Sequence, residues 1–331
     1  MAQVIRWGIL GCGHIAKKFA ADLKLVKDAR LVAIGARSSA TADAFAAAFP
    51  VDAVHYSYEA LVADPTVDVI YIATPHSFHY EHTLLCLQHG KAVLCEKPFA
   101  MNSRQTRVMI DTAKEKKIFL MEALWSKFLP QYDKVQELLR QGKIGTLKSV
   151  LVNFGFRPVP PIKPRMFDPA LGGGTMMDIG IYNVFMAMSV LGRPHIIEAS
   201  MTPAATGVDE QCAVLFKYNN GAMAQLFSSF TTDLPTEAEI NGTEGRIKLT
   251  SRFFDPNAQI ELYTGGLDTK QLIEVPKEQG FGYQYQARHV NACLQQGLTE
   301  SPVMRFEDTL ALMETLDAIR QVAGIKYPAD E

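Results

Sequence analysis

The chain has 331 residues, of which 48% are hydrophobic and 21% are charged, so it can bury a large core and is long enough for two domains. A formal net charge of −2, without a long run of like charge, argues against nucleic acid or a membrane surface as the main partner. The five scattered cysteines form no C-x-x-C pair, which argues against a disulfide framework or a zinc site and predicts small buried side chains.

Short apolar runs alternate with amphipathic segments up to about residue 122. This alternation predicts a doubly wound parallel sheet with helices on both faces. The expected strands span residues 3–10, 30–36, 53–55, 68–73, 91–95 and 118–122. The expected helices span residues 14–26, 39–48, 57–63, 78–89 and 103–116. Residues 1–122 are therefore expected to form one α/β domain.

The pattern changes in the second half of the chain. A helix near 130–141 is expected to precede a strand at 147–156, a proline-rich loop at 158–169 and a helix near 175–190. Strands with hairpin turns follow at 211–218, 222–230 and 236–250, and helices near 283–296 and 307–322 close the chain. Residues 123–331 are expected to form an α+β domain with a mostly antiparallel, open-faced sheet and helices on one face. The last helix is a candidate to pack back on the first domain.

Neither a signal peptide nor a membrane span is evident in the sequence. The first apolar run begins within a few residues of Met1, which leaves no room for a signal peptide. No stretch approaches the run of about 20 apolar residues that a membrane span needs. We therefore expect a cytoplasmic protein.

A glycine turn joins the first strand to the first helix. Gly11 allows the tight turn, Gly13 lets the backbone approach a pyrophosphate, and Ala16 keeps the helix close to the strand. The phosphates would lie at the positive end of that helix. The turn therefore predicts a dinucleotide site, and the alternative is a glycine turn without a ligand. The expected contacts in this turn are Gly11, Cys12, Gly13, His14 and Ile15.

The residues after the second strand indicate which dinucleotide binds. NAD-specific chains usually carry an acidic residue there for the ribose 2′-hydroxyl, whereas this chain has Arg37-Ser38-Ser39. The guanidinium of Arg37 suits a bidentate contact with a 2′-phosphate, and the hydroxyl of Ser38 can assist. NADP is therefore favoured over NAD. The alternative is that Arg37 is a solvated loop cation.

Two further strand ends carry polar residues. Ligands of such sheets bind outside the carboxyl ends of the strands, so we expect this group to line the nucleotide: Thr74, Pro75, His76, His79, Glu96 and Lys97. The histidines are spaced by threes with His82, but Glu81 is the one nearby carboxylate, and no metal site is expected. Lys97 could polarise a carbonyl or move a proton if burial lowers its pKa. An ion pair between Glu96 and Lys97 is the alternative.

A third candidate region follows Gly172-Gly173-Gly174. On a helix, Asp178 and Tyr182 are four residues apart and share one face, so a carboxylate and a phenol would point to the same place. The alternative is a buried hydrogen-bonded pair. Candidate substrate contacts are Trp125, Phe154, Phe156, Arg165, Asn183 and Phe281, although a single aromatic residue is more often part of a core.

Taken together, the glycine turn, Glu96-Lys97-Pro98 and the segment from Gly172 to Tyr182 resemble the glucose–fructose oxidoreductase and inositol dehydrogenase (Gfo/Idh/MocA) superfamily. The resemblance covers nearly the whole chain. The segment 121–130 is similar to the branch that contains dimeric dihydrodiol dehydrogenases and NADP-dependent D-xylose dehydrogenases. Tyr182 fits this branch, because most members of the superfamily carry histidine there. Lys127 departs from it, since the mammalian diol enzymes have arginine.

The resemblance implies a Rossmann domain followed by a substrate domain whose open sheet forms a homodimer. It also implies Lys97, Asp178 and Tyr182 as the catalytic group of an NADP(H)-dependent oxidoreductase. The expected reaction passes hydride to or from a sugar, cyclic diol or dicarbonyl carbon, with Tyr182 exchanging the hydroxyl proton, Lys97 lowering the pKa of the phenol and Asp178 orienting the substrate or Lys97. An anhydro-sugar reductase or inositol-type dehydrogenase is the alternative enzyme. A noncatalytic dinucleotide-binding sensor is the alternative of another class.

Overall fold

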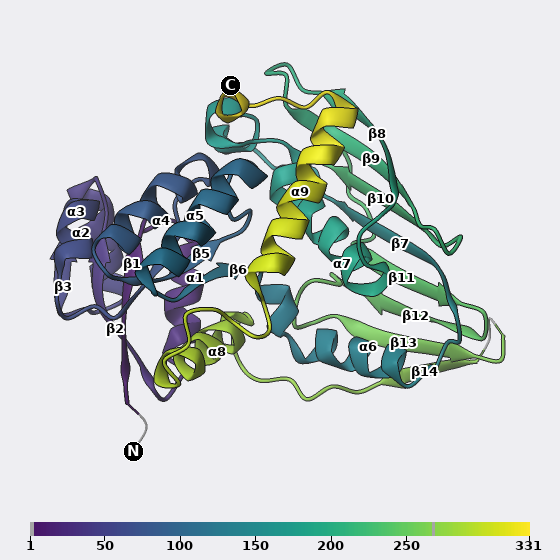
Figure 1. Ribbon diagram of the computed structural model, residues 1–331, viewed down its shortest axis with the longest axis horizontal. Coiled ribbons are helices and arrows are strands. Elements are labelled where there is room, and N and C mark those ends of the chain that lie inside the picture. Colours follow the sequence, from purple (N-terminus) through teal and green to yellow (C-terminus); the bar gives the residue numbers. More distant parts are fainter. Residues whose placement is uncertain (1–2, 267–268) are drawn as a thin grey trace. The chain divides into compact units, whose positions relative to one another are not determined.

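The computed structural model describes residues 3–266 and 269–331, and the chain divides into two compact units (Figure 1). The first unit comprises Met1–Phe128 and Glu278–Leu310, and the second comprises Leu129–Lys277 and Ala311–Glu331. The sequence places the boundary at residues 122/123 and assigns the rest of the chain to the second domain, with the last helix as a candidate to pack back on the first. The structure differs because a late segment of the chain completes the first unit.

The first unit is built on a six-stranded sheet with the order β3-β2-β1-β4-β5-β6. All of its strand pairs are parallel, as predicted. Strands β4, β5 and β6 are buried at every position because helices cover both faces. The strands are β1 (Ile5–Leu10), β2 (Ala29–Gly35), β3 (Ala53–His55), β4 (Val69–Ile72), β5 (Ala92–Glu96) and β6 (Leu120–Ala123). The helices are α1 (His14–Leu23), α2 (Ser39–Ala48), α3 (Tyr58–Ala63), α4 (His79–Gln88) and α5 (Ser103–Lys116), with 3₁₀ turns at His76–Phe78 and Trp125–Phe128.

Helix α8 (Tyr283–Gln295) belongs to this first unit and packs against α1. The carboxylate of Asp22, near the end of α1, accepts hydrogen bonds from the backbone N–H groups of Phe281 at 2.9 Å and Tyr283 at 2.8 Å. The indole N–H of Trp7 in β1 donates to Asn291 Oδ1 at 3.0 Å. These buried polar contacts explain why a segment so late in the chain completes the first unit.

The second unit is built on an eight-stranded sheet with the order β14-β13-β12-β11-β7-β10-β9-β8. Strands β7 and β10 are parallel and the other pairs are antiparallel, so the mostly antiparallel sheet is confirmed. The sequence analysis gives no range for the strands at 196–203, 259–264 and 270–273. The strands are β7 (Leu147–Gly155), β8 (Ile196–Pro203), β9 (Asp209–Lys217), β10 (Met223–Ser229), β11 (Glu237–Gly242), β12 (Gly245–Thr250), β13 (Gln259–Thr264) and β14 (Lys270–Ile273).

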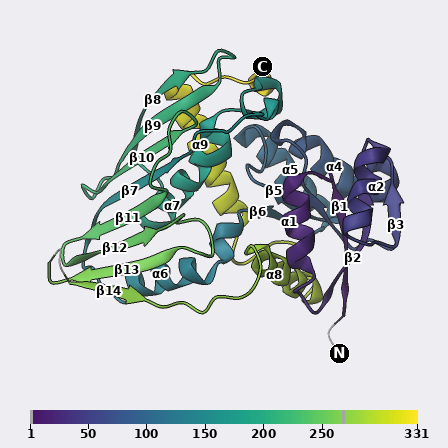
Figure 2. The ribbon, with the colours of Figure 1, turned by 180° about the vertical axis from the view of Figure 1, so that it is seen from behind.

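Helices α6 (Pro130–Arg140) and α7 (Ile181–Leu191) lie on one face of this sheet (Figures 1 and 2). Along β7, Val150 and Val152 are buried under the helices, whereas Leu151 between them is 39% exposed. Helix α9 (Phe306–Ala323) gives its first residues to the first unit and the rest to the second. Short 3₁₀ turns lie at Pro164–Met166, Pro169–Leu171 and Pro328–Asp330.

One segment is more apolar than the sequence analysis anticipates. Pro169–Leu191 is long and apolar enough to cross a membrane by length and composition, although 72% of its most apolar window is buried inside the protein. It is also not one regular helix, because a π-helical turn at Met176–Gly180 precedes α7. The helix expected near 175–190 is present, and its first part is a π-helical turn. A buried core helix gives the same composition signal.

Candidate functional site

The glycine turn of the first unit contains two glycines, which are there for different structural reasons. Gly11 has φ +95°, and a Cβ there would lie 2.9 Å from Thr74 Cγ2 and 3.1 Å from the Ala73 carbonyl oxygen. The fold itself therefore requires glycine at this position. Cys12 beside it is buried, and burial raises the pKa of its thiol to about 11. This cysteine is a packing residue, like the other four, which are also buried.

Gly13 is exposed and is not required by the surrounding protein. Its φ of −79° suits any residue, and among the described residues a Cβ would meet just the Ala73 carbonyl oxygen, at 3.9 Å. Helix α1 begins at the next residue, His14, and within the described chain no side-chain hydrogen bond caps it. The first N–H groups of a helix are left without intrahelical partners and attract anions. The open glycine and the uncapped helix therefore fit a pyrophosphate.

Arg37 lies exposed just after β2, at the same end of the sheet. Its guanidinium carbon is 5.4 Å from the centroid of the Phe78 ring, and its charge lowers the pKa of nearby Tyr58, although burial raises that pKa more strongly. Burial lowers the pKa of His82 to about 4, with smaller contributions from the charges of His79 and Arg37. His82 is therefore neutral near pH 7, and Arg37 supplies the positive charge. The Ser38 hydroxyl accepts a hydrogen bond from the Thr41 N–H at 3.4 Å and caps α2.

The ends of β4 and β5 are tied together by His79. Its Nδ1 is 2.7 Å from the Pro98 carbonyl oxygen and its Nε2 is 2.9 Å from the Thr74 carbonyl oxygen. The side chain is fully buried, and burial lowers its pKa. His79 therefore supports the loops that follow these strands, in place of the direct cofactor contact that the sequence predicts. Thr74 and Pro75 stay half-buried beside it.

Glu96 and Lys97 follow directly at the end of β5. The Tyr71 hydroxyl donates to Glu96 Oε1, and the Lys97 backbone N–H donates to Glu96 Oε2 at 3.2 Å. Glu96 is 6% exposed, so its carboxylate is anchored inside the unit. This places Lys97 at the carboxyl end of a central strand, where ligands of such sheets bind.

Glu122 in β6 is a buried acidic residue that the sequence analysis does not single out. Its side chain is 1% exposed, and among the described residues neither carboxyl oxygen forms a hydrogen bond of good geometry. Burial raises the pKa of Glu122 to about 7, and the Thr309 hydroxyl, the Phe99 backbone and the Lys127 charge oppose this increase. Lys127 itself forms an ion pair with Asp308 at 3.1 Å. Within residues 3–266 and 269–331, no group of three or more His, Cys, Asp or Glu could hold a metal ion.

The carboxylate and the phenol lie on successive turns of the second unit. Asp178 is in the π-helical turn and Tyr182 is in the first turn of α7. Arg165 Nη2 lies 3.8 Å from Asp178 Oδ2, and the two side chains are 43% and 16% exposed. The Asp178 carboxylate is therefore partly open to solvent beside a cation. Turns of the π type are frequent at functional sites.

An aromatic wall surrounds the Tyr182 ring. Tyr182 stacks on Phe254 with ring centroids 4.8 Å apart, and Phe254 stacks on Phe154 at 4.5 Å. Phe156 contacts Phe230 edge-on at 5.2 Å, in the cluster formed by Met166, Ile179 and Phe230. The sequence predicts Phe154 and Phe156 here but misses Phe254. The Phe253-Phe254 pair between two strands is the signal that could have indicated it.

Two predicted substrate contacts, Asn183 and Trp125, are buried packing residues, whereas a third, Phe281, is 49% exposed. Asn183 is 1% exposed, and its Nδ2 donates to the Phe227 carbonyl oxygen at 2.9 Å. Trp125 is 6% exposed and stacks on Tyr283 at 4.7 Å within the first unit. Phe281 also belongs to the first unit, where Lys18 Nζ lies 5.4 Å from its ring centroid. An aromatic residue in a sequence does not reveal which neighbour it will meet.

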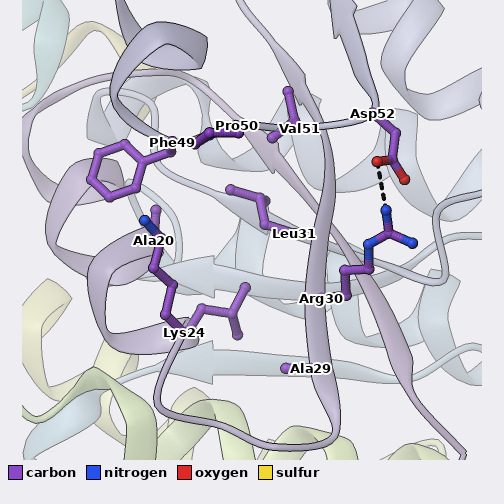
Figure 3. A pocket seen from close by; sticks show the side chains of 10 residues that line it. Ala20, Lys24, Ala29, Arg30, Leu31, Phe49, Pro50, Val51 and Asp52 are labelled. Carbon is purple, nitrogen blue, oxygen red and sulfur yellow. Dashed lines mark hydrogen bonds and ion pairs between the residues drawn. The ribbon is translucent and has the colours of Figure 1, made fainter.

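A surface pocket of the first unit lies at the other end of the sheet from the glycine turn (Figure 3). Lys24 from the end of α1 and Phe49 and Pro50 from the segment before β3 form one side of it. Arg30 and Asp52, paired at 2.6 Å, lie on the other side. Because ligands of doubly wound sheets bind at the carboxyl ends of the strands, this pocket is not the dinucleotide site.

Comparisons with known proteins agree with this geometry. The model of an oxidoreductase family with an NAD-binding Rossmann fold matches residues 5–124, and that of the GFO/IDH/MocA C-terminal domain matches residues 132–248. The trans-1,2-dihydrobenzene-1,2-diol dehydrogenase of Xenopus laevis is 37% identical over 334 residues, covering 98% of this chain and 99% of the relative. The human enzyme of the same name is 35% identical over 338 residues, covering 99% and 100%.

Solved structures share the fold over nearly the full length. The 3-ketoreductase of Actinomadura kijaniata, solved with NADP and TDP-benzene, has a TM-score of 0.86 and 26% identity, covering 96% of this chain and 98% of its own. Other structures of that enzyme carry alanine or glutamate in place of a lysine, or phenylalanine in place of a tyrosine. The aldose-aldose oxidoreductase of Caulobacter crescentus has a TM-score of 0.88 at 23% identity, covering 97% and 98%, a likeness of fold.

Proposed function

The chain belongs to the GFO/IDH/MocA oxidoreductase family, and from that premise we propose that it is an NADP(H)-dependent dehydrogenase of a small cyclic diol or sugar. One observation carries the proposal. The relatives named trans-1,2-dihydrobenzene-1,2-diol dehydrogenase match this chain over nearly its whole length. The similarity therefore includes the second unit, which holds Asp178 and Tyr182, as well as the dinucleotide half.

The first unit has residues that fit the dinucleotide. Gly13 and the start of α1 would hold the pyrophosphate, because the glycine leaves space there and the helix start is uncapped within the described chain. Arg37 would hold the 2′-phosphate, with the neutral His82 nearby adding no second cation. When bound, NADP accepts or supplies a hydride at its nicotinamide ring.

The second unit supplies the groups that orient the substrate and move the proton. In oxidation, the Tyr182 phenolate accepts the proton of the substrate hydroxyl, and in reduction the phenol returns it. Asp178 accepts a hydrogen bond from a substrate hydroxyl, and Arg165 Nη2 lies 3.8 Å from its Oδ2. To Lys97 of the first unit we assign the positive charge that favours the phenolate. The aromatic wall of Phe154 and Phe254 suits the apolar face of a ring substrate.

Turnover assays on the purified protein test this function. We expect NADP⁺ to be reduced in the presence of trans-1,2-dihydrobenzene-1,2-diol or an aldose, followed by the absorbance of the reduced nicotinamide, and more slowly with NAD⁺. Inositols and anhydro-sugars belong in the same panel, because they test the alternative enzyme. Tight NADPH binding without turnover of any of these substrates in either direction would instead support a noncatalytic sensor.

The uncovered face of the second sheet favours a homodimer. Opposite α6 and α7, this face exposes Leu151 at 39%, Ile196 at 45% and Met223 at 48%. Apolar side chains that gather on an open sheet face are typical of an interface between subunits. A dimeric mass by light scattering at micromolar concentration is expected, and a monomeric mass would contradict it. The cytoplasmic location and the absence of nucleic-acid and membrane partners stay predictions from composition.

A further inference from the structure

We propose that Asp209 is a positioning residue for the turn that carries Asp178 and Tyr182, an inference that rests on the function proposed above. Asp209 is the first residue of β9 and is fully buried. Its Oδ2 accepts two hydrogen bonds, from Thr175 Oγ1 at 2.5 Å and from the Met176 backbone N–H at 2.7 Å. Both donors lie at the start of the π-helical turn, three and two residues before Asp178.

A second buried hydroxyl extends this anchor to the centre of the sheet. Ser228 Oγ in β10 lies 3.0 Å from Thr175 Oγ1. Because the Thr175 hydroxyl proton points to the carboxylate, Ser228 must be the donor in this contact. Thr175 is therefore held between β9 and β10, and the π-helical turn starts from a fixed point on the sheet.

The glycines before the π-helical turn let the backbone pack closely against the Asp209 carboxylate. Gly174 has φ +104°, and a Cβ there would lie 2.3 Å from Asp209 Oδ1 and 3.2 Å from the Tyr327 hydroxyl oxygen. The Tyr327 hydroxyl donates to the Gly173 carbonyl oxygen at 2.6 Å, and the Gly174 N–H donates to the Met166 carbonyl oxygen at 2.8 Å. The backbone at Gly174 therefore lies so close to Asp209 that no side chain would fit between them.

The buried charge of Asp209 has no evident value for stability. Burial raises the pKa of Asp209 to about 6, against the opposing hydrogen bonds from Thr175 and Met176. In the described part of the chain, Oδ1 has no hydrogen-bond partner. An ionised carboxylate in this state costs stability near neutral pH, and a neutral side chain of similar size would cost less. Both hydrogen bonds of Asp209 hold the start of the π-helical turn that carries Asp178. The residue therefore positions this turn.

Two other titratable groups face Asp209. Burial raises the pKa of the Cys212 thiol to about 12 and that of the Tyr327 phenol well above its usual value. Behind Tyr327, Arg320 is paired with Asp330 at 2.8 Å. Cys212 and Tyr327 therefore stay neutral near pH 6, and Asp209 is the group in this set that changes its charge there.

The variants Thr175→Val and Asp209→Asn test the proposal in the full-length enzyme. Valine keeps the shape of Thr175 but removes its hydroxyl, so we expect kcat to fall by about 10-fold, because a small misplacement of catalytic groups is costly, with an unchanged Kd for NADPH. Hydrogen exchange of the backbone amides in 176–182 should become faster. Thr175→Ser should restore both values. We expect the kcat of the wild type to decrease as pH falls through about 6, where Asp209 becomes protonated. This decrease should be absent in Asp209→Asn, since asparagine does not titrate.

Matched controls come from the same unit. Thr315→Val removes another buried hydroxyl, which bonds the Ala311 carbonyl oxygen in α9, and Asp233→Asn neutralises an exposed aspartate that accepts from the Arg157 N–H. Neither should change kcat or exchange in 176–182. Wild-type exchange and wild-type kcat in folded Thr175→Val and Asp209→Asn would overturn the positioning role. Failure of the proposed function is a separate result, because it would show as no turnover by the unsubstituted protein, whereas hydrogen exchange in 176–182 can be compared among the variants without any turnover.

Discussion

Both functional turns contain glycines, but the glycines are there for opposite structural reasons. Around Gly13 in the first unit, a Cβ would meet just one described atom, at 3.9 Å, so the space belongs to something outside the protein. At Gly173 and Gly174 in the second unit, a Cβ would lie 2.7 Å and 2.3 Å from other protein atoms. The first turn is open for a ligand, and the second is filled by the protein that positions its catalytic groups. A glycine motif therefore needs its surroundings before it can be interpreted.

The largest expected effect separates chemistry from binding. Tyr182→Phe removes a positioned proton-transfer group of the second unit, so turnover should fall by ~10²–10⁴-fold while NADPH affinity stays nearly unchanged. Steady-state kinetics and fluorescence titration with NADPH measure the two quantities. Near-full turnover across pH would make the phenol a packing residue.

Lys97→Met should lower turnover as well. Because Lys97 and Tyr182 are expected to act as one unit, the double variant should lose far less than the product of the two single effects. Multiplicative losses would show two independent roles and would break the assignment of Lys97 to the phenolate.

Alanine at the two turns tests the comparison directly. Gly174→Ala forces a Cβ into Asp209 at positive φ, so the free energy of unfolding should fall by roughly 2–6 kcal/mol, from backbone strain and overpacking together. Gly13→Ala should change that free energy by less than about 1 kcal/mol, because its backbone conformation suits alanine. It should instead weaken NADPH binding by about 10-fold, equal to about 1.4 kcal/mol. Thermal unfolding with and without NADPH gives both values, and equal stability losses in the two variants would remove the distinction.

The buried carboxyl group of Glu122 in the first unit makes the stability of the protein depend on pH. The pKa of Glu122 rises from 4.5 to about 7 in the folded protein, so the folded state binds more protons than the unfolded state between these values. Stability should therefore decrease as pH rises through this window, by about 3 kcal/mol for Glu122 alone. Unfolding of Glu122→Gln, compared with the wild type at the two ends of the window, isolates this contribution. A parallel pH dependence in both proteins would mean that Glu122 is ionised throughout.

The last prediction concerns the choice of cofactor. Arg37→Ala removes a charge-assisted phosphate contact, so NADPH affinity should fall by roughly 10–100-fold while NADH affinity stays constant. Arg30→Ala is the matched control. Arg30 is an exposed arginine near the start of β2, at the opposite end of the strand from Arg37, and it is paired with Asp52. Equal affinities of the unsubstituted protein for NADPH and NADH would contradict the role of Arg37 before any variant is made.

Local motifs could be predicted from the sequence, and long-range partners could not. The parallel sheet and the glycine turn follow from residues that are close together in the chain, and the structure confirms them. The contacts of Asp209 with Thr175, and of Tyr327 with Gly173, join residues 34 and 154 positions apart. No spacing rule indicates such pairs. Trp125 shows the same limit, because its aromatic ring predicts burial but not the partner on which it stacks.

The return of residues 278–310 to the first unit affects the order in which the chain can fold as it leaves the ribosome. The eight-stranded sheet lies within the uninterrupted stretch 129–277 and can form as soon as that stretch has emerged. The dinucleotide half must wait, because Trp7 and Asp22 find their partners Asn291 and Tyr283 near the end of synthesis. Domains usually fold first at the N-terminus. Here the half that is made first closes only after residues 129–277 have been made, and until then the Trp7 indole and the Asp22 carboxylate lack these partners.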